Sequence, residues 1–345
     1  MISYGRQSIN KKDISSVVKV LKSDWLTTGP EVLKFEKKIS KIVNAKYTTV
    51  VNSATSALHI ACLALGVKKN DRVWTTSNTF VSSINSALFC GAKVDLVDIN
   101  LKNFNIDIKN LRTKLKIAKK NKKLPHVLIV VHFAGHPCDL KEIYKLSRIY
   151  KFKIIEDASH ALGSIYLNSK IGSCRYSDIT VFSFHPVKMI TTGEGGAATC
   201  NDRYLYAKLK SYRSHGIIYL NKEKNRPWMF YQKYLGFNYR LNDIQASLGL
   251  SQLKRANLGI KKRVRIAKKY HKYFQNKNYI ISQSQIIEGH AYHLFIILVK
   301  KRKELYEHLK SKNINCQIHY IPIYKLSYYN KYNINKNDFL NSENY

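Results

Sequence analysis

Short apolar runs alternate with helical patterns between about residues 45 and 215, and this alternation limits the fold more than any other feature. The strand-like runs cover residues 47–51, 72–75, 93–98, 126–132, 153–156, 179–183 and 196–200. Helical patterns follow Thr55 and Phe80 and cover residues 140–150. Parallel strands need a crossover connection, usually a helix, and helices then cover both faces of the sheet. The sequence therefore predicts an α/β fold with a mostly parallel sheet.

The regions on either side of this alternation have a different pattern. Residues 14–21 and 35–42 have helical periodicity, and so do the longer stretches 241–256 and 260–274. A strand is expected at 293–299 and a helix at 305–310. A chain of 345 residues with 45% hydrophobic content is long enough for two domains. We expect a large α/β domain over residues 1–235 and a smaller α+β domain over residues 236–345.

One lysine lies in a polar, Gly-rich loop directly after an apolar run, in the segment Ser-Phe-His-Pro-Val-Lys-Met-Ile-Thr-Thr-Gly-Glu-Gly-Gly at residues 183–196. Partial burial lowers the pKa of a lysine amine and makes it nucleophilic, and a Schiff base with pyridoxal phosphate is a common use of such a lysine. Lys188 is therefore the candidate catalytic residue. A surface lysine is the competing interpretation, and it is disfavoured by the other segments that fit the same cofactor.

Those segments match the other needs of pyridoxal phosphate. Asp157 ends a β-branched strand, where it would pair with the pyridine nitrogen or only cap a helix. Thr55 and Ser56 open an Ala/Leu-rich helix, and its N-terminus would bind the phosphate or be an ordinary hydroxyl cap. Phe80 precedes a second helix, where it would stack on the ring or lie in the core.

The order and spacing of these segments resemble the DegT/DnrJ/StrS family of pyridoxal-phosphate sugar aminotransferases, over essentially the whole chain from residue 27 to residue 322. The resemblance implies the fold type I architecture of such enzymes and a role for each matching residue. Lys188 forms the Schiff base and Asp157 pairs with the pyridine nitrogen. The remaining cofactor-binding residues are Thr55, Ser56 and Ser183 at the phosphate, Phe80 on the ring and His160 near the phenolic oxygen.

The resemblance also implies a homodimer with shared active sites. The segment Gly-Phe-Asn-Tyr-Arg at 236–240 matches a family motif in which Asn238 reaches the cofactor phosphate of the neighbouring subunit and Arg240 lies near the nucleotide sugar. His185, His319 and Tyr320 are further candidate substrate residues.

The lysine loop is most similar to that of transaminases of pseudaminic acid biosynthesis. These enzymes transfer an amino group, with glutamate as the implied donor, to C4 of a UDP-linked 4-keto-6-deoxy-N-acetylhexosamine. Another nucleotide-linked keto sugar is a second candidate substrate. The lysine disfavours a dehydrase branch of the family, which carries histidine at this position. Two hypotheses of a different class stay open, namely a non-catalytic protein with this fold and a basic nucleic-acid-binding protein.

Charge is the basis of the nucleic-acid hypothesis. Lys and Arg number 59 against 22 Asp and Glu, which gives a net charge of +37. The lysines are spread along the chain, and only 116–123 and 254–269 are dense. No nucleic-acid-binding motif accompanies them. We therefore interpret the charge as a compositional bias that also attracts a diphosphate-linked sugar, and we expect no nucleic-acid partner.

Compartment and metal content follow from weaker signals. The six cysteines contain no Cys-x-x-Cys pair, which is typical of reduced thiols in the cytoplasm. No apolar run approaches the ~20 residues of a membrane span, so no membrane association is expected. His132 and His136 flank a loop without a third ligand nearby, so no metal site is expected. The family usually continues for some tens of residues beyond Tyr345, so the small domain is expected to be incomplete.

Overall fold

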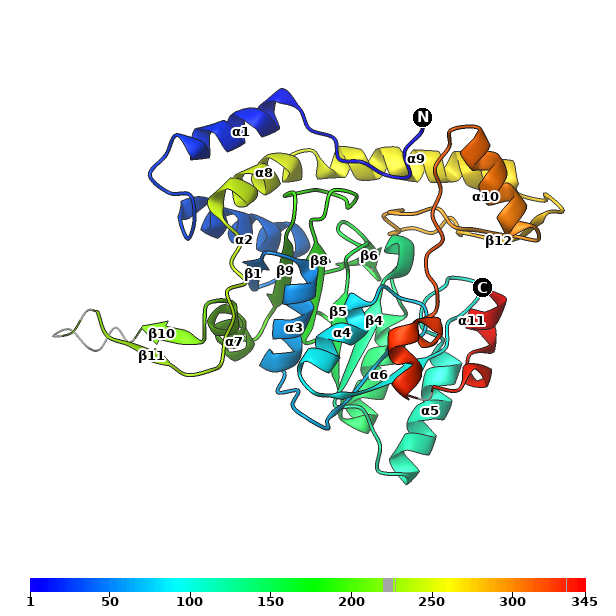
Figure 1. Cartoon of the computed structure of the whole chain (residues 1–345), viewed down its shortest axis with the longest axis horizontal. Coiled ribbons are helices and arrows are strands. Elements are labelled where there is room, and N and C mark those ends of the chain that lie inside the picture. The colour runs from blue at the N-terminus through cyan, green and yellow to red at the C-terminus, as the bar shows by residue number, and fades with distance from the viewer. Residues whose placement is uncertain (220–225, 227, 333) are drawn as a thin grey trace.

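Seven strands form one mixed sheet at the centre of the molecule (Figure 1). The computed structural model describes residues 1–219, 226, 228–332 and 334–345. The spatial order is β1-β9-β8-β5-β4-β2-β3, with β1 (Tyr47–Val51), β2 (Arg72–Thr76), β3 (Lys93–Val97), β4 (Val127–Val131), β5 (Lys153–Asp157), β8 (Ile179–Ser183) and β9 (Gly196–Cys200). Strands β3, β2, β4, β5 and β8 run parallel, whereas β9 is antiparallel to both β8 and β1. The predicted α/β fold with a mostly parallel sheet is confirmed.

Helices cover both faces of this sheet. One face packs against α3 (Ala54–Ala64), α4 (Ser82–Phe89) and α7 (Arg203–Arg213). The other packs against α2 (Pro30–Val43), α5 (Ile108–Lys120) and α6 (Leu140–Tyr150). All five residues of β4, Val-Leu-Ile-Val-Val, are consequently buried. A strand covered on both faces has no polar side, which explains its continuous apolar sequence.

The parallel strands bring polar loops to one edge of the sheet. Asp157 is the last residue of β5 and Ser183 is the last residue of β8, and these two strands are direct neighbours. Helix α3 begins just after β1 ends. Ligands of open α/β sheets bind beyond the carboxyl ends of the strands, so this edge is where a site is expected.

The remaining elements lie around this core. The α-helices among them are α1 (Lys11–Leu21), α8 (Asp243–Leu253), α9 (Ala256–Phe274), α10 (Arg302–Ser311) and α11 (Leu340–Asn344). Three antiparallel strand pairs are formed by β6 (Ile165–Tyr166) with β7 (Ser169–Lys170), β10 (Ile217–Tyr219) with β11 (Phe230–Gln232) and β12 (Ile280–Gln283) with β13 (Ile297–Val299). The 3-10 helices are η1 (Phe133–Gly135), η2 (Ile323–Lys325), η3 (Ser327–Tyr332) and η4 (Lys336–Asp338). Figure 1 shows α9 crossing one end of the molecule and the β10–β11 pair projecting from it.

Helix α8 is hydrogen-bonded to the N-terminal part of the chain. Its first residue, Asp243, is fully buried and accepts hydrogen bonds from the backbone nitrogens of Gly29 (2.7 Å) and Glu31 (2.8 Å) at the start of α2. A carboxylate at a helix N-terminus satisfies free N–H groups and complements the helix dipole. The domain boundary at residue 236 stays a prediction, and α8 packs against α1 and α2 on the N-terminal side of it.

Several local predictions need correction. The strand predicted at 293–299 covers only Ile297–Val299, because residues before it dock on η1: the amides of Ala291 and Leu294 donate to the carbonyls of Gly135 and Ala134. Helix α5, which contains the first five residues of the basic run at 116–123, was not predicted. Helix α7 and the β10–β11 pair were not predicted.

In the part of the chain that the structure describes, no helix combines the length and the apolar character needed to cross a bilayer.

Candidate active site

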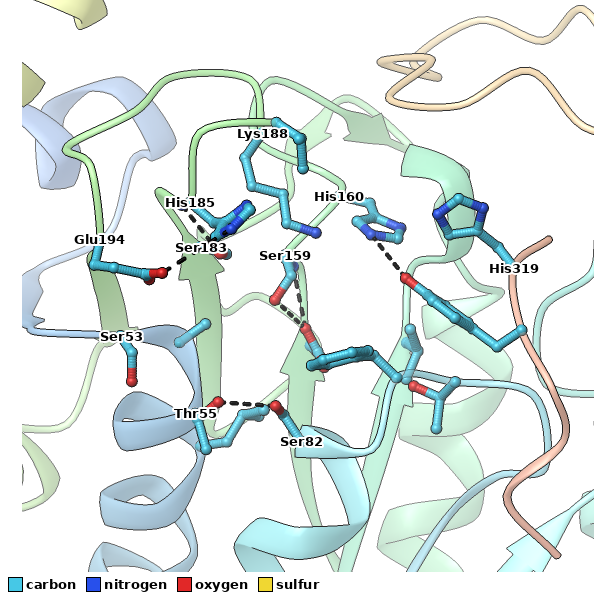
Figure 2. Close-up of a pocket in the computed structure, with 18 of the residues that line it drawn as sticks. Ser53, Thr55, Ser82, Ser159, His160, Ser183, His185, Lys188, Glu194 and His319 are labelled. Atoms are coloured by element: carbon cyan, nitrogen blue, oxygen red, sulfur yellow. Dashed lines mark hydrogen bonds and ion pairs between the residues drawn. The ribbon is translucent and has the colours of Figure 1, made fainter. Parts of the chain in front are cut away.

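A cavity of about 400 Å³ opens at the carboxyl edge of the sheet (Figure 2). Nine of the predicted site residues line it: Thr55, Phe80, Asp157, His160, Ser183, His185, Lys188, His319 and Tyr320. They come from regions of the chain that are far apart in sequence. The fold therefore brings together residues that were selected separately from the sequence.

Lys188 lies in the loop that connects the antiparallel strands β8 and β9. The loop is closed by hydrogen bonds from the Phe184 amide to the Gly195 carbonyl (2.9 Å) and from the Thr192 amide to the Phe184 carbonyl (3.0 Å). Phe184 and Ile190 are buried and anchor it to the core. Figure 2 shows the Lys188 amine pointing into the cavity, toward Ser159. The backbone of this loop thus fixes where the amine can reach.

The environment of Lys188 makes its amine nucleophilic. Burial disfavours the charged form and lowers the pKa of Lys188 to about 8, although the negative charge of Asp157 opposes this shift. A substantial fraction of the amine is therefore neutral near pH 8. A neutral amine is the form that attacks a carbonyl.

We expect the reactivity of Lys188 in the cofactor-free protein to titrate near pH 8, whereas exposed lysines titrate near ~10.4. Competitive labelling with acetic anhydride, followed by peptide mass spectrometry, measures both in one sample. Because the folded-state pKa lies below the unfolded one, the unfolded state binds more protons between these pH values. Lys188 therefore makes the free energy of unfolding rise as the pH increases through this window. A Lys188 peptide that titrates with the surface lysines would contradict the buried position.

Asp157 is held in a fixed orientation at the floor of the cavity. Its Oδ2 accepts a hydrogen bond from the Ser83 hydroxyl (2.7 Å), and its Oδ1 accepts from the amide (3.1 Å) and hydroxyl (2.6 Å) of Ser159. The residue is 5% exposed. A buried carboxylate with this support is suited to stabilise a cation such as a protonated ring nitrogen.

The start of α3 forms a second part of the cavity wall. Ser53 is the N-cap residue, and its hydroxyl accepts from the Ser56 amide (3.1 Å). The Thr55 hydroxyl contacts the Ser82 hydroxyl at 2.8 Å. A Cβ on Gly196 would lie 2.6 Å from the Ala54 nitrogen, so only glycine lets β9 approach this helix end. The resulting cluster of hydroxyls at a helix N-terminus is suited to bind a phosphate.

The structure does not bring the Ser56 side chain to the cavity wall. Its hydroxyl donates to Asn52 Oδ1 (2.7 Å) and contacts the Ser53 hydroxyl within the helix cap. Ser53 lines the cavity in its place. A role of Ser56 at a phosphate stays a prediction.

Histidines and Tyr320 form the opposite wall. The Tyr320 hydroxyl lies 3.4 Å from His160 Nε2, and His319 Nε2 lies 2.7 Å from the Tyr4 hydroxyl. Burial, together with the charge of Lys188, lowers the pKa of His319 to about 4 and that of His160 well below its usual range. Both imidazoles are therefore neutral at pH 7 and act as hydrogen-bonding groups without charge.

Phe80 and His185 lie at the mouth of the cavity. The Phe80 ring is 56% exposed and its centroid lies 6.0 Å from that of Tyr320. His185 Nε2 lies 4.0 Å from a carboxylate oxygen of Glu194. Both residues line the cavity, as Figure 2 shows for His185, so each is placed to contact a ligand that enters it.

Asn238 and Arg240 do not line this cavity. Their segment runs beside the end of β1, where the Asn52 amide donates to the Tyr239 carbonyl (2.9 Å) and Arg240 pairs with Val51. Asn238 is exposed. The predicted roles of both residues toward a neighbouring subunit stay predictions.

Several lining residues were not selected from the sequence: Tyr4, Ser53, Ser82, Ser159 and Glu194. Ser53 and Glu194 carry a sequence signal, because Ser53 is at the N-cap position of the helix after β1 and Glu194 lies in the Gly-rich lysine loop. Tyr4 gave no signal, because it reaches the cavity only through the fold of the N-terminal segment.

Of the two histidines that were considered as metal ligands, the first is engaged in hydrogen bonds. Both ring nitrogens of His132 are occupied: Nε2 pairs with Glu156 (2.7 Å) and Nδ1 accepts from the Cys138 amide (3.0 Å). Among the described residues, no group of three or more potential ligands is arranged to hold a metal ion.

These residues fit pyridoxal phosphate. The cavity provides a nucleophilic lysine, a buried carboxylate and a hydroxyl-rich helix end, which correspond to the aldehyde, the pyridine nitrogen and the phosphate. In addition, His160 Nδ1 is buried without a hydrogen-bond partner in the described part of the chain, as expected for a wall that contacts a polar ligand. The fold and the site thus define a pyridoxal-phosphate enzyme of the aminotransferase class.

The comparisons with known proteins agree with this assignment to the aminotransferases. The model of the DegT/DnrJ/EryC1/StrS aminotransferase family matches residues 7–345. A UDP-4-amino-4,6-dideoxy-N-acetyl-beta-L-altrosamine transaminase from Campylobacter jejuni is 41% identical over 96% of this chain and 86% of its own length. Helicobacter pylori PseC, an aminotransferase involved in the biosynthesis of pseudoaminic acid, has a TM-score of 0.87 at 32% identity over 96% of this chain and 87% of that one.

A sugar aminotransferase from Streptococcus pneumoniae described as putative, in its PMP-form, has a TM-score of 0.89 at 26% identity over 100% of this chain and 92% of that one. The chain belongs to the DegT/DnrJ/EryC1/StrS aminotransferase family, and its cofactor is pyridoxal phosphate.

Proposed function

We propose that this protein transfers an amino group from glutamate to C4 of a UDP-linked 4-keto-6-deoxy-N-acetylhexosamine, a step of pseudaminic acid biosynthesis. The observation that carries the proposal is the 41% identity with the Campylobacter jejuni transaminase over 96% of the chain. The cavity supports it, because Lys188 and Asp157 stand together in a largely buried position. A non-catalytic protein would have no need to maintain a lysine whose pKa is lowered to about 8.

The residues of the cavity divide the chemical work. When bound, pyridoxal phosphate supplies a carbonyl that carries the amino group and a ring that withdraws electrons from the reacting carbon. Asp157 provides the negative charge that keeps the ring nitrogen protonated. The Lys188 amine moves a proton to and from the donor α-carbon. The start of α3, with Ser53 and Thr55, anchors the phosphate, and Phe80 and Tyr320 form part of the wall around the ring.

The experiment that tests the substrate follows each half-reaction separately. The holoenzyme is mixed with glutamate, and its absorbance is expected to change to that of the amino form of the cofactor. The UDP-linked 4-keto sugar is then expected to restore the original spectrum and to give a 4-amino sugar by mass spectrometry. A panel of UDP-, GDP- and dTDP-linked keto sugars is the control. A preference for another nucleotide or for another keto position would contradict the proposed substrate.

We also propose that the enzyme is a homodimer with shared active sites. The β10–β11 pair projects from the body of the molecule and carries or adjoins the exposed side chains Trp228, Phe230 and Leu235 (Figure 1). Large exposed apolar side chains on a projecting arm are typical of a contact with another chain. Asn238 follows this arm, is exposed and does not line the cavity of its own chain. If the sites are shared, two inactive variants that lack Lys188 and Asn238, respectively, complement each other.

The cytoplasm is the compartment that we propose for this reaction. All six cysteines are free, and four of them are buried. Free thiols are typical of a reducing compartment. Fractionation of the native cells, with the activity assayed in each fraction, tests the proposal, and activity confined to a membrane or secreted fraction would contradict it.

A further inference from the structure

Two cysteines lie close together where α3 packs against α4, outside the active-site cavity. Cys62 lies on α3 and is fully buried, whereas Cys90 caps the C-terminal end of α4 and is partly exposed. Both sulfurs contact Ser86 of α4. The Cys62 Sγ lies 3.9 Å from the Ser86 hydroxyl, and the Cys90 Sγ lies 3.4 Å from the Ser86 carbonyl oxygen. The proposed transamination uses neither thiol.

The spacing of residues along the two helices explains why these groups meet. On a helix, residues three or four positions apart lie on the same face. His59 and Cys62 are three residues apart on α3, and Ser86 precedes Cys90 by four residues at the end of α4. The two faces meet in the contact between the helices, where the side chains of Cys62 and His59 both hydrogen-bond to Cys90. The result is a cluster of two thiols and one imidazole.

Cys62 and Cys90 differ in acidity. The hydrogen bond from Cys62, followed by the one from His59, lowers the pKa of Cys90 to about 6, although burial opposes the shift. The same contact with Cys90, together with burial, raises the pKa of Cys62 well above its usual range. Near pH 7 the pair therefore holds one proton, on Cys62, and Cys90 is a thiolate. The thiolate is the nucleophilic form of cysteine.

Three other buried thiols have a different environment. Cys138, Cys174 and Cys200 each donate a hydrogen bond to a backbone carbonyl, at 3.1, 3.2 and 3.6 Å, respectively. Burial raises the pKa of all three thiols, and that of Cys200 rises further because Cys174 lies nearby. These three cysteines are consequently uncharged at pH 7. Proximity to another cysteine thus does not by itself make a thiol reactive here.

We propose that Cys90 and Cys62 form a modification site, at which a hydroperoxide oxidises the two thiols to a disulfide. In the first step the Cys90 sulfur attacks the peroxide, the O–O bond breaks, and Cys90 becomes a sulfenic acid while an alkoxide or hydroxide leaves. The Cys62 sulfur then displaces hydroxide from Cys90, and the Cys62 proton leaves with this hydroxide as water. In total the two sulfurs lose two electrons, and the hydroperoxide is reduced to an alcohol and water.

This site does not depend on the proposed transamination. Helices α3 and α4 begin at the cavity, where the hydroxyls of Thr55 and Ser82 lie 2.8 Å apart. Cys62 lies seven residues further along α3 than Thr55, which corresponds to about 10 Å along the helix axis. The cysteines therefore lie beyond the reach of a ligand in the cavity, and the oxidation can be tested with the cofactor bound.

The experiment treats the reduced holoenzyme with hydrogen peroxide at pH 7, blocks the remaining thiols in denaturant and maps the unreduced peptides by mass spectrometry. We expect one disulfide, between the Cys62 and Cys90 peptides, that dithiothreitol reverses. C62S is expected to stop at the sulfenic acid of Cys90, which dimedone labels. C90S is expected to leave Cys62 unmodified, because Cys62 is buried and remains protonated.

Alkylation by iodoacetamide gives a second readout. The rate at Cys90 is expected to reach half of its maximum near pH 6 in wild type, compared with ~8.5 for an ordinary thiol. C62S should move this midpoint to higher pH, because it removes the thiol that donates to Cys90. C174S is the matched control: it removes a buried thiol next to Cys200 and should change neither the midpoint nor the disulfide.

Three results would overturn the inference. In the first, Cys90 of the wild-type protein stays a sulfenic acid, as in C62S. In the second, peroxide links a different pair of cysteines. In the third, no cysteine reacts before the protein unfolds. If C62S does not fold, the wild-type peptide map and C90S decide by the same criteria. A holoenzyme that forms the disulfide but aminates no nucleotide sugar would contradict the proposed function and leave this site in place.

Discussion

Lys188→Ala is expected to abolish turnover, with a loss of about 10⁴-fold or more, while the protein remains folded. The alanine lacks both the nucleophile that captures the cofactor and the base that moves the proton at the donor α-carbon, and proton transfer alone contributes ~10²–10⁴-fold. Folding should not suffer, because the substitution removes an amine whose burial is unfavourable to its charged form. Product formation is measured by mass spectrometry of the amino sugar, and folding by thermal unfolding.

Lys254→Ala is the control for this prediction, since Lys254 is exposed at the end of α8. It should keep full activity. Borohydride reduction of the holoenzyme, followed by peptide mass spectrometry, should place the cofactor on the Lys188 peptide in wild type and in K254A, and on no peptide in K188A. Turnover by K188A at more than a few per cent of wild type would refute the assignment of the catalytic lysine.

Mixing two inactive variants, Lys188→Ala and Asn238→Ala, is expected to restore activity. In a dimer with shared sites, the subunit that lacks Asn238 still has Lys188, and its partner still has Asn238. Random exchange makes about half of the dimers hybrid, each with one intact site of two, so about 25% of wild-type activity is expected. Activity is assayed after subunit exchange, and light scattering reports the mass of the species.

Asp157→Ala mixed with Lys188→Ala is the matched control. Asp157 and Lys188 line the same cavity of one chain, so every site of that hybrid lacks one of the two. This mixture should stay inactive. If the Asn238 mixture also stays inactive, or if Asn238→Ala alone is fully active, then the sites are not shared through Asn238.

The sequence predicted the central strands well, because their signals are local. A strand such as Val127–Val131 is apolar throughout, and turn and helix signals bound it on both sides. The residues of the recognised motifs were found for the same reason: Lys188 and Asp157 each lie at the end of an apolar run. The boundaries were less accurate at helix α3, which begins at Ala54 because Ser53 caps it.

Other elements could not be predicted, because their conformation depends on distant parts of the chain. The strand predicted over residues 293–299 is shorter because residues 291–294 bond to the loop after β4. Tyr4 lies more than three hundred residues from His319 in sequence, and the two meet only in the folded chain.

Local sequence patterns and long-range packing therefore account for different features of this protein. The α/β class and the candidate residues Lys188 and Asp157 could be predicted from the sequence alone, because strand periodicity and Gly-rich loops are encoded within short segments. The folded structure was needed to show that Ser53 lines the cavity while the Ser56 hydroxyl turns into the helix cap. Pairing, burial and cavity shape are properties of groups brought together by folding, and no local pattern in the chain records them.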